Sequence, residues 1–362
     1  MIYYIAHSDW ILKQSRADIV KKLNDNLQIT SICPLDENSK EIAEIYSSSI
    51  EWNISRTKLF DLIGVINLRK IIQELNKDDI LHVFTIKTLF LLIISSLFFK
   101  KKFKVCVSIT GLGYLFADTL LAKFIKIILR PFIILKINNL VDMIIFQNDK
   151  NQSDFIKYSK YNKKSNIISG SGLNTDAFIE KEDITLPVKV IFVGRLMREK
   201  GVREYIEIAE IMHKNLNVEF FIAGEPDFGN KSSLNEKEFQ ELKNHNSIKY
   251  LGKINVYKDL KSFDVLIQPS YHEGFSRILL EATYAGLYTI SNNIPGIKEI
   301  VEATNFGVLV KNNDVLTYVE EIEHFIQHLD VSGTEEAKKI IFKLFSVDAV
   351  SDQFSNIYHE LI

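Results

Sequence analysis

The chain of 362 residues contains little cysteine, little proline and almost no net charge. Its two cysteines, Cys33 and Cys106, lie in no metal-binding or redox spacing, so we expect both to be reduced and structural, as in a cytoplasmic protein. A formal net charge of −2 and the lack of a nucleic-acid-binding motif argue against nucleic acid as a partner. No Gly-x-Gly-x-x-Gly sequence follows the first predicted strand, which argues against a nicotinamide-dependent dehydrogenase.

Long hydrophobic segments are also missing. The apolar run from Leu89 to Phe99 is 11 residues long, whereas a membrane-spanning helix needs about 18 or more. The first ten residues lack a basic region before an apolar core, so we expect them to form a first strand and not a signal peptide. No Asp-x-Asp sequence suggests a divalent-metal site, and we expect no metal cofactor.

Short apolar segments alternate with segments of helical periodicity along the whole chain, and 46% of the residues are hydrophobic. This pattern predicts an α/β protein with two doubly wound parallel sheets, whose ligands bind at the carboxyl ends of the strands. We expect domains at residues 1–165 and 188–345, a linker at 166–187 and a closing helix at 346–362. The strands are predicted near Ile2–Ala6, Gln28–Cys33, Ile80–Phe84, Lys104–Ile109, Met143–Gln147, Val188–Val193, Val218–Ala223, Ile248–Tyr250, Val265–Gln268, Tyr288–Ser291 and Gly307–Leu309.

Two carboxylates follow the predicted strand that ends at Gln268. Glu273 lies in the loop after the strand, and Glu281 lies eight positions later, inside a helix predicted over Ser276–Ala285. At about 1.5 Å rise per residue, the two carboxylates are roughly 12 Å apart along the helix axis. That separation suits hydrogen bonds to two hydroxylated rings with a diphosphate between them, as in a sugar nucleotide. The phosphate would bind the unpaired amides of the helix N-terminus, which we expect to be those of Gly274, Phe275 and Ser276.

Two cations follow the predicted strand Val188–Val193. Arg195 and Lys200 flank a short polar loop that begins at Gly194, and Gly201 allows the backbone to turn closely. Arginine binds phosphate through its planar fork and lysine as a mobile point charge, so the pair could clamp a pyrophosphate. Each motif alone has a plain alternative, because surface glutamates, lysines and arginines are usually solvated. The two motifs together favour a site for a nucleotide sugar.

These segments resemble the retaining glycosyltransferases of family 4, which have the GT-B fold of two Rossmann-like domains facing a central cleft. The C-terminal helix returns to the N-terminal domain in that fold. The resemblance implies that Arg195 and Lys200 hold the diphosphate, Glu273 the donor sugar and Glu281 the ribose, with Glu273, Arg195 and Lys200 catalytic. It extends the donor site to Gly194, Gly224, Gly252, Ile254, Gly274, Phe275 and Ser276. The segments that carry it are GRLMREKGV (194–202), FFIAGEPD (220–227), YLGKI (250–254), DVLIQPSYHEGFSRILLEA (264–282) and NNIPGIKEIVE (292–302).

The N-terminal half resembles the subgroup that extends polyprenyl-diphosphate-linked sugars, including N-acetylgalactosaminyltransferases. Many relatives carry a histidine where this chain has Thr110 and Gly111, so we assign no histidine to acceptor activation there. The loop at residues 6–15 contains no glycine, which argues against a phosphate role for it. The acceptor side is predicted from His82, Lys87, Thr110, Gly111, Gly113 and Asn174, with a purely structural role as the alternative for His82.

Charge is shared unevenly between the two halves. Residues 1–165 carry 24 Lys/Arg and 16 Asp/Glu, a net of +8, and the remainder carries 20 and 30, a net of −10. The basic segment Leu120–Asn139 suits contact with an anionic membrane surface, with an ordinary solvated helix as the alternative. Its lysines and arginine (Lys123, Lys126, Arg130, Lys136) would meet headgroups while Phe124, Ile127, Ile128, Phe132 and Ile133 are immersed. The segment Leu89–Lys104 is a second candidate, with a buried helix as its alternative.

The resemblance implies transfer of a sugar from a UDP-sugar, N-acetylgalactosamine or another hexose, with retention of configuration. The acceptor would be a polyprenyl-diphosphate-linked saccharide in bacterial surface polysaccharide biosynthesis. The departing phosphate would take the proton of the acceptor hydroxyl, without a covalent intermediate. Such an enzyme would lie in the cytoplasm, attached to the inner face of the bacterial cytoplasmic membrane. Two alternatives stay open: a nonhydrolysing sugar-nucleotide epimerase, which shares the fold, and a catalytically inactive glycan- or nucleotide-binding subunit.

Overall fold

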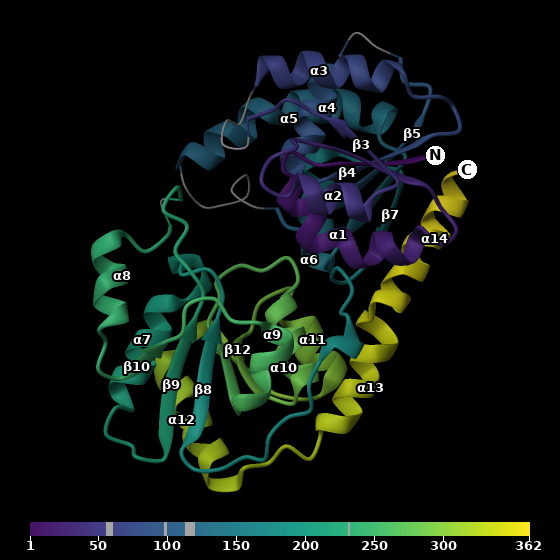
Figure 1. Cartoon of the computed structure of the whole chain (residues 1–362). Coiled ribbons are helices and arrows are strands. Elements are labelled where there is room, and N and C mark those ends of the chain that lie inside the picture. The colour runs from purple at the N-terminus through teal and green to yellow at the C-terminus, as the bar shows by residue number, and fades with distance from the viewer. Residues whose placement is uncertain (56–60, 98–99, 113–119, 231) are drawn as a thin grey trace. The chain divides into compact units, whose positions relative to one another are not determined.

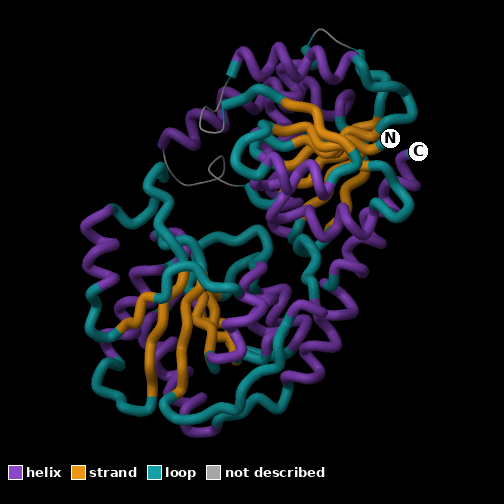
Figure 2. The backbone as a smooth tube through the Cα atoms, viewed as in Figure 1, coloured by secondary structure: helices purple, strands orange, loops and turns teal. Residues whose placement is uncertain are grey.

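The computed structural model describes residues 1–55, 61–97, 100–112, 120–230 and 232–362. The chain divides into two compact units (Figure 1). The first unit contains Met1–Gly172 and Val347–Ile362, and the second contains Leu173–Ser346. Each unit is built on one parallel sheet covered by helices, which confirms the predicted α/β fold of two Rossmann-like domains (Figure 2).

The first unit is built on a seven-stranded parallel sheet with strand order β3-β2-β1-β4-β5-β6-β7. Helices α1, α2 and α14 pack on one face of this sheet, and α3, α4, α5 and α6 pack on the other. The strands are β1 (Ile2–Ile5), β2 (Ile29–Cys33), β3 (Ser48–Glu51), β4 (Ile80–Phe84), β5 (Lys104–Ile109), β6 (Met143–Phe146) and β7 (Lys164–Ile167). The helices are α1 (Asp9–Leu23), α2 (Ser39–Ile45), α3 (Leu62–Gln73), α4 (Ile86–Ser95), α5 (Leu120–Leu140), α6 (Asp149–Ser159) and α14 (Val347–Leu361).

The second unit is built on a six-stranded parallel sheet with strand order β10-β9-β8-β11-β12-β13. Helices α7, α8 and α12 contribute to the core on one face, and α10, α11 and α13 to the core on the other. The strands are β8 (Val188–Val193), β9 (Val218–Ala223), β10 (Ile248–Tyr250), β11 (Val265–Gln268), β12 (Tyr288–Asn292) and β13 (Val308–Val310). The helices are α7 (Val202–Ile211), α8 (Glu236–Lys243), α9 (Val256–Asp259), α10 (Arg277–Ala285), α11 (Lys298–Thr304), α12 (Val315–His328) and α13 (Thr334–Phe345).

The central strands are mostly apolar because both faces of a parallel sheet are buried. All residues of β4 and β11 are buried, for example. The edge strands β3 and β7 are not predicted from the sequence, since their sequences, SSIE and KSNI, are polar and largely uncovered. Strand β7 lies partly in the segment predicted as a linker.

Helix α4 carries the apolar run that was one candidate for membrane contact. Seven of its residues, Thr88–Ile93 and Ser95, are buried in the first unit. The run is therefore an ordinary core helix, the alternative that the sequence left open. None of the helices in the described part of the chain is long and apolar enough to span a bilayer.

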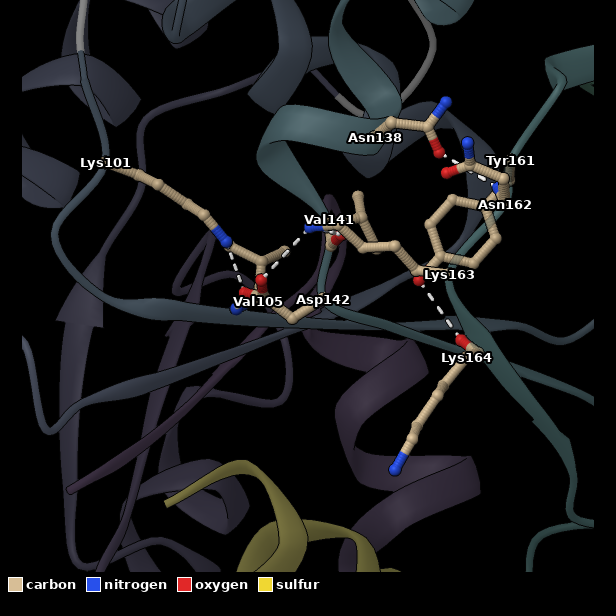
Figure 3. Close-up of polar contacts among 9 residues, drawn as sticks. All are labelled: Lys101, Val105, Asn138, Val141, Asp142, Tyr161, Asn162, Lys163 and Lys164. Atoms are coloured by element: carbon tan, nitrogen blue, oxygen red, sulfur yellow. Dashed lines mark hydrogen bonds and ion pairs between the residues drawn. The ribbon is translucent and has the colours of Figure 1, made fainter.

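Asp142 ties together the amino ends of β5 and β6 in the first unit (Figure 3). Its Oδ2 accepts hydrogen bonds from the amide of Val105, at 2.9 Å, and from the ammonium group of Lys101. Lys163 lies 3.5 Å from Oδ1 and donates to the carbonyl of Val141 at 3.1 Å. Because ligands of parallel sheets bind at the carboxyl ends of the strands, this cluster is structural, and it engages one of the lysines of residues 100–104.

The C-terminal helix α14 returns to the first unit, as predicted, and packs against α1. Its Tyr358 is fully buried, and the hydroxyl lies 2.6 Å from Nδ1 of His82 and 2.6 Å from the hydroxyl of Tyr4. Nε2 of His82 lies 2.8 Å from Oγ of Ser108. Both ring nitrogens of His82 are thus bonded inside the core, and its exposed fraction is 0%. The acceptor-side assignment of His82 is wrong, and the histidine is structural.

We expect this buried histidine to make stability depend on pH. Burial, with a smaller contribution from the Arg16 guanidinium, holds the pKa of His82 well below its ordinary value. The unfolded chain therefore binds a proton near pH 6.5 that the folded chain does not, and stability falls as the pH drops below about 6.5. The loss should reach about 1.4 kcal/mol per pH unit.

The measurement is the thermal unfolding midpoint at pH 7.5, 6.5 and 5.5 for the wild type and His82→Gln. The substitution should flatten the decline on the acidic side, whereas His213→Gln, which changes an exposed histidine of the second unit, should not. Parallel pH curves for the wild type and His82→Gln would contradict this assignment.

Candidate active site

The loop between β11 and α10 presents the first predicted carboxylate. The side chain of Glu273 is 10% exposed, and its Oε1 lies 2.7 Å from Nζ of Lys200. Ser276 caps α10, because its hydroxyl accepts from the amide of Leu279 at 3.3 Å. One expectation fails here: the amide of Ser276 is not an unpaired donor, since it donates to the carbonyl of Gly296 at 2.8 Å.

The loop after β8 brings Lys200 to Glu273. A short 3-10 helix, Arg198–Lys200, ends at Gly201, whose φ is +77°. A Cβ at Gly201 would lie 2.1 Å from the carbonyl oxygen of Pro269, so only glycine allows the two loops to approach this closely. The amide of Tyr271 donates to the carbonyl of Glu199 at 2.9 Å and fastens the loops together. The loops that follow the neighbouring strands β8 and β11 therefore bring Lys200 and Glu273, one from each predicted motif, into a single ion pair.

Arg195 lies in the same loop but is more exposed than Lys200. Its guanidinium lies 3.5 Å from Oδ2 of Asp227, and the exposed fraction of its side chain is 57%. Gly194 donates its amide to the carbonyl of Ala223 at 3.0 Å. Gly224, with φ of +130°, comes so close to Gly194 that a Cβ would lie 1.8 Å from its carbonyl oxygen. Glycine at this position lets the loops after β8 and β9 pack tightly.

The remaining predicted donor residues lie after β10 and in the β11–α10 loop. Gly252 accepts from the amide of Gly224 at 2.8 Å, and a Cβ at Gly252 would meet no atom within 4 Å. The side chain of Ile254 is partly buried and packs against the core cluster that includes Phe275. The backbone of Gly274 lies against the turn after β12, since a Cβ at Gly296 would lie 2.7 Å from its carbonyl oxygen.

Glu281 takes a different partner from Glu273. Its Oε1 accepts from Nε of Arg277, one turn earlier in α10, at 2.8 Å, and its side chain is 9% exposed. Arg277 also donates to the hydroxyl of Tyr257 at 3.0 Å. Burial raises the pKa of Glu281, and the Arg277 guanidinium opposes that rise. The structure therefore pairs Glu273 with Lys200, and Glu281 with Arg277. The second pair was not predicted from the sequence, although Arg277 and Glu281 have i, i+4 spacing.

Lys87, Thr110 and Gly111 lie where strands β4 and β5 of the first unit end. Nζ of Lys87 donates to the carbonyl of Ser55 at 3.0 Å, and burial lowers the pKa of Lys87. Thr110 and Gly111 follow β5 and are partly exposed. Asn174 belongs to the second unit and is exposed, so the acceptor-side set does not come from one unit. Gly113 lies outside the described residues.

His7 is a residue at this sheet edge that the sequence analysis misses. It follows β1, and its Nδ1 lies 3.1 Å from Oγ1 of Thr85 and 3.2 Å from Oγ1 of Thr88. Thr85 has φ of +78° and ψ of +153°, a conformation that costs a β-branched residue on the order of 1–3 kcal/mol. The rule that ligands bind at strand carboxyl ends could have identified His7, which directly follows the predicted strand Ile2–Ala6.

Two family models match the chain. A model described as glycosyl transferase 4-like matches residues 1–171, and a model described as glycosyl transferases group 1 matches residues 174–340. Together they account for both units. The chain is a glycosyltransferase, with a glycosyl transferase 4-like N-terminal half and a glycosyl transferases group 1 C-terminal half.

Two relatives with named activities are 23% and 25% identical to the chain. The chain is 23% identical over 345 residues to N,N'-diacetylbacillosaminyl-diphospho-undecaprenol alpha-1,3-N-acetylgalactosaminyltransferase of Campylobacter jejuni, covering 90% of this chain and 89% of that protein. It is 25% identical to UDP-Gal:alpha-D-GlcNAc-diphosphoundecaprenol alpha-1,3-galactosyltransferase of Escherichia coli, covering 94% and 90%. An uncharacterized 42.6 kDa protein of the Klebsiella pneumoniae cps region is 27% identical, but the match spans 56% of this chain and only 46% of that protein.

Solved structures show the same fold. Alr3699/HepE of Anabaena, in complex with UDP and glucose, has a TM-score of 0.78 at 17% identity, and the match covers 99% of both chains. Sucrose-phosphate synthase of Thermosynechococcus elongatus also has a TM-score of 0.78, at 16% identity, covering 99% of this chain and 98% of that one. These likenesses establish the GT-B fold of the whole chain.

Proposed function

We propose that this glycosyltransferase moves a sugar from a UDP-sugar to a polyprenyl-diphosphate-linked saccharide, with retention of configuration, in bacterial surface polysaccharide biosynthesis. The observation that carries the proposal is the Lys200–Glu273 pair, which two loops form at the carboxyl ends of β8 and β11. A cation for phosphate and a carboxylate for sugar hydroxyls are what a nucleotide sugar requires. The named relatives from Campylobacter jejuni and Escherichia coli, both of which act on undecaprenol-diphosphate-linked sugars, support the acceptor class.

Catalysis in this proposal is mainly electrostatic. As the glycosidic bond breaks, negative charge grows on the departing diphosphate, and Lys200 and Arg195 provide positive charge that stabilises it. Glu273 accepts a hydrogen bond from a hydroxyl of the donor sugar, and Glu281 accepts one from a hydroxyl of the ribose. The departing phosphate takes the proton of the acceptor hydroxyl on the same face of the sugar, so no protein nucleophile is needed.

The donor sugar is proposed as N-acetylgalactosamine or another hexose. One relative is named as an N-acetylgalactosaminyltransferase and the other as a galactosyltransferase. The decisive experiment is a screen of sugar nucleotides against synthetic polyprenyl-diphospho-N-acetylglucosamine, with the linkage of the product determined by NMR. Release of nucleoside diphosphate that requires the lipid-linked acceptor supports transfer. Interconversion of sugar nucleotides without acceptor would indicate an epimerase, and binding without turnover an inactive subunit.

We also propose that transfer requires no divalent metal, because the two cations of the site can carry the charge of the leaving group. No group of three or more metal-binding side chains occurs among the described residues. Turnover in millimolar EDTA should stay within about twofold of turnover in magnesium, a difference below about 0.4 kcal/mol in activation free energy. Loss of activity in EDTA, with recovery on addition of one metal, would contradict this.

Helix α5 is the proposed contact with an anionic membrane surface. Its apolar side chains Ile127, Ile128, Phe132 and Leu135 are between 42% and 71% exposed. Ile133, expected to be immersed, is instead buried in the core, and the side chains of Lys123 and Phe124 lie outside the described set.

The basic side chains of α5 also contact the protein. Nζ of Lys126 lies 5.5 Å from the ring centroid of Tyr158, and Nε of Arg130 donates to the carbonyl of Tyr158 at 3.2 Å. Lys136 donates to the carbonyl of Leu97 at 3.2 Å. All three basic residues remain at least partly exposed, beside the exposed apolar ones.

We expect Ile127→Glu combined with Leu135→Glu to abolish flotation with anionic liposomes while UDP affinity stays unchanged. The two side chains are 70% and 71% exposed, and immersing each would contribute up to about 1.5–3 kcal/mol. Wild-type flotation should weaken as salt rises, because charge attraction to the headgroups is screened.

The matched control is Leu216→Glu with Leu316→Glu, two leucines of the second unit that are 91% and 61% exposed. Equal flotation of the α5 variant, the control variant and the wild type would show that α5 is an ordinary solvated helix.

A further inference from the structure

Gln268 is the last residue of β11 and is 4% exposed. Its side-chain amide lies between the two ends of the loop that carries Glu273. Nε2 donates to Oε1 of Glu273 at 2.8 Å, and Oε1 of Gln268 accepts from the hydroxyl of Ser276 at 2.7 Å. Nε2 also lies 3.5 Å from Oγ of Ser270, a marginal contact. A buried amide at the end of a strand thus connects the proposed sugar-binding carboxylate to the cap of α10.

The hydrogen-bond network determines which way this amide points. An ionised carboxylate only accepts hydrogen bonds, so Gln268 must present its NH₂ group to Glu273. Its carbonyl oxygen then faces Ser276, whose oxygen already accepts from the amide of Leu279 at 3.3 Å and whose proton is free to be donated. Each donor in the chain Ser276–Gln268–Glu273 therefore meets an acceptor, and the reverse orientation of the amide would place two acceptors together.

Glu273 receives both of its donors on one oxygen. Lys200 and Gln268 donate to Oε1 at 2.7 and 2.8 Å, and no described group bonds Oε2. Lys200 is flexible and 25% exposed, and in the proposed function it turns to the diphosphate of the donor. Gln268 is buried and fixed at both ends, so it can hold the carboxylate in place when Lys200 moves.

We infer that Gln268 is a positioning residue for the transfer reaction: it holds Glu273 through Oε1 and leaves Oε2 to accept a hydrogen bond from a hydroxyl of the donor sugar. The inference rests on the proposed function, because it assigns Glu273 to the sugar. A carboxylate that is held before the substrate binds loses less freedom on binding and is better oriented in the transition state. Gln268 itself touches no reacting atom.

The test compares Gln268→Leu with the wild type in three measurements: the Kd of UDP, the Kd of the UDP-sugar and kcat. Leucine fills a similar volume but donates nothing. We expect an unchanged Kd for UDP, a Kd for the UDP-sugar raised several-fold and a kcat lowered by about tenfold, roughly 1.4 kcal/mol. A purely structural role would instead lower the unfolding temperature and weaken both ligands equally.

A second variant, Gln268→Glu, should show a pH dependence of activity that a change in packing alone would not produce. In Gln268→Glu the new carboxyl group lies beside Glu273, and two carboxyl groups at hydrogen-bond distance share one proton. When protonated, the new group can donate to Glu273 as the amide does, so activity relative to wild type should rise at least threefold between pH 8 and pH 6. Thr283→Val is the matched control, since it replaces a buried hydroxyl of α10 that has no hydrogen-bond partner in the described part of the chain.

The outcomes separate this inference from the proposed function. If the wild type binds no UDP-sugar, the proposed function fails and the inference fails with it. If the wild type binds and transfers a sugar but Gln268→Leu matches Thr283→Val in all three measurements, only the role of Gln268 is overturned. The same conclusion follows if Gln268→Glu loses activity equally at every pH.

Discussion

Lys200→Ala should lower kcat by roughly 30- to 1,000-fold, which corresponds to about 2–4 kcal/mol of lost transition-state stabilisation. Two effects combine in this variant. The departing diphosphate loses a cation, and Glu273, whose side chain is only 10% exposed, loses its ionic partner at 2.7 Å. Arg195→Ala should act in the same direction through the diphosphate alone, because Arg195 pairs with Asp227 and not with Glu273.

The matched control for Lys200 is Lys249→Ala. Lys249 forms an ion pair of 2.8 Å with Glu219 in the same unit, but its side chain is 60% exposed and belongs to β10, not to the loops that carry Lys200 and Glu273. Exposed pairs of this kind contribute about 0–1 kcal/mol to stability and should contribute nothing to turnover. A kcat for Lys200→Ala within threefold of the wild-type value would remove Lys200 from the proposed mechanism.

Substitution of Glu273 and of Glu281 should affect different steps, sugar transfer and UDP binding respectively. We expect Glu273→Gln to lower kcat by about 100-fold or more and to leave the Kd of UDP within about threefold, because its partner is the sugar. Glu281→Gln should raise the Kd of UDP, because its partner is the ribose. It should also lower the unfolding temperature by a few degrees, because Arg277 loses the carboxylate that its Nε contacts at 2.8 Å.

Isothermal titration with UDP alone, together with kcat at saturating donor, distinguishes these two losses. Glu302→Gln is a suitable control, since this glutamate of α11 is 59% exposed and pairs with Lys298 at 3.4 Å. An equal loss of UDP affinity in Glu273→Gln and Glu281→Gln would contradict the division of roles between them.

The core of the fold could be predicted because buried parallel strands have a strong sequence signal. Strands β8, β9 and β11 begin and end at the predicted residues, since each is an apolar run with only one charged or polar residue. Strands β3 and β7 lie at sheet edges, where half of the surface is uncovered and polar residues are tolerated, so their sequences carry no such signal.

The site was only partly predictable, for a related reason. The sequence shows that Lys200 and Glu273 each follow a buried strand, and the adjacency of β8 and β11 in the sheet then brings them together. It does not show side-chain direction. His82 points into the core toward Tyr358, a residue 276 positions away, and Gln268 points toward Glu273, so the first was assigned to the site and the second was overlooked.

The most direct test of the central claim is transfer of a labelled sugar from its UDP-sugar to polyprenyl-diphospho-N-acetylglucosamine. The donor is the one that the sugar-nucleotide screen selects, and the product is extracted into organic solvent and its anomeric configuration determined by NMR. We expect label in the lipid, with the configuration of the donor, for the wild type and Lys249→Ala, and a loss of roughly 30-fold or more for Lys200→Ala. Label that stays in the nucleotide fraction with wild-type enzyme, or that reaches the lipid equally well with Lys200→Ala, would contradict it.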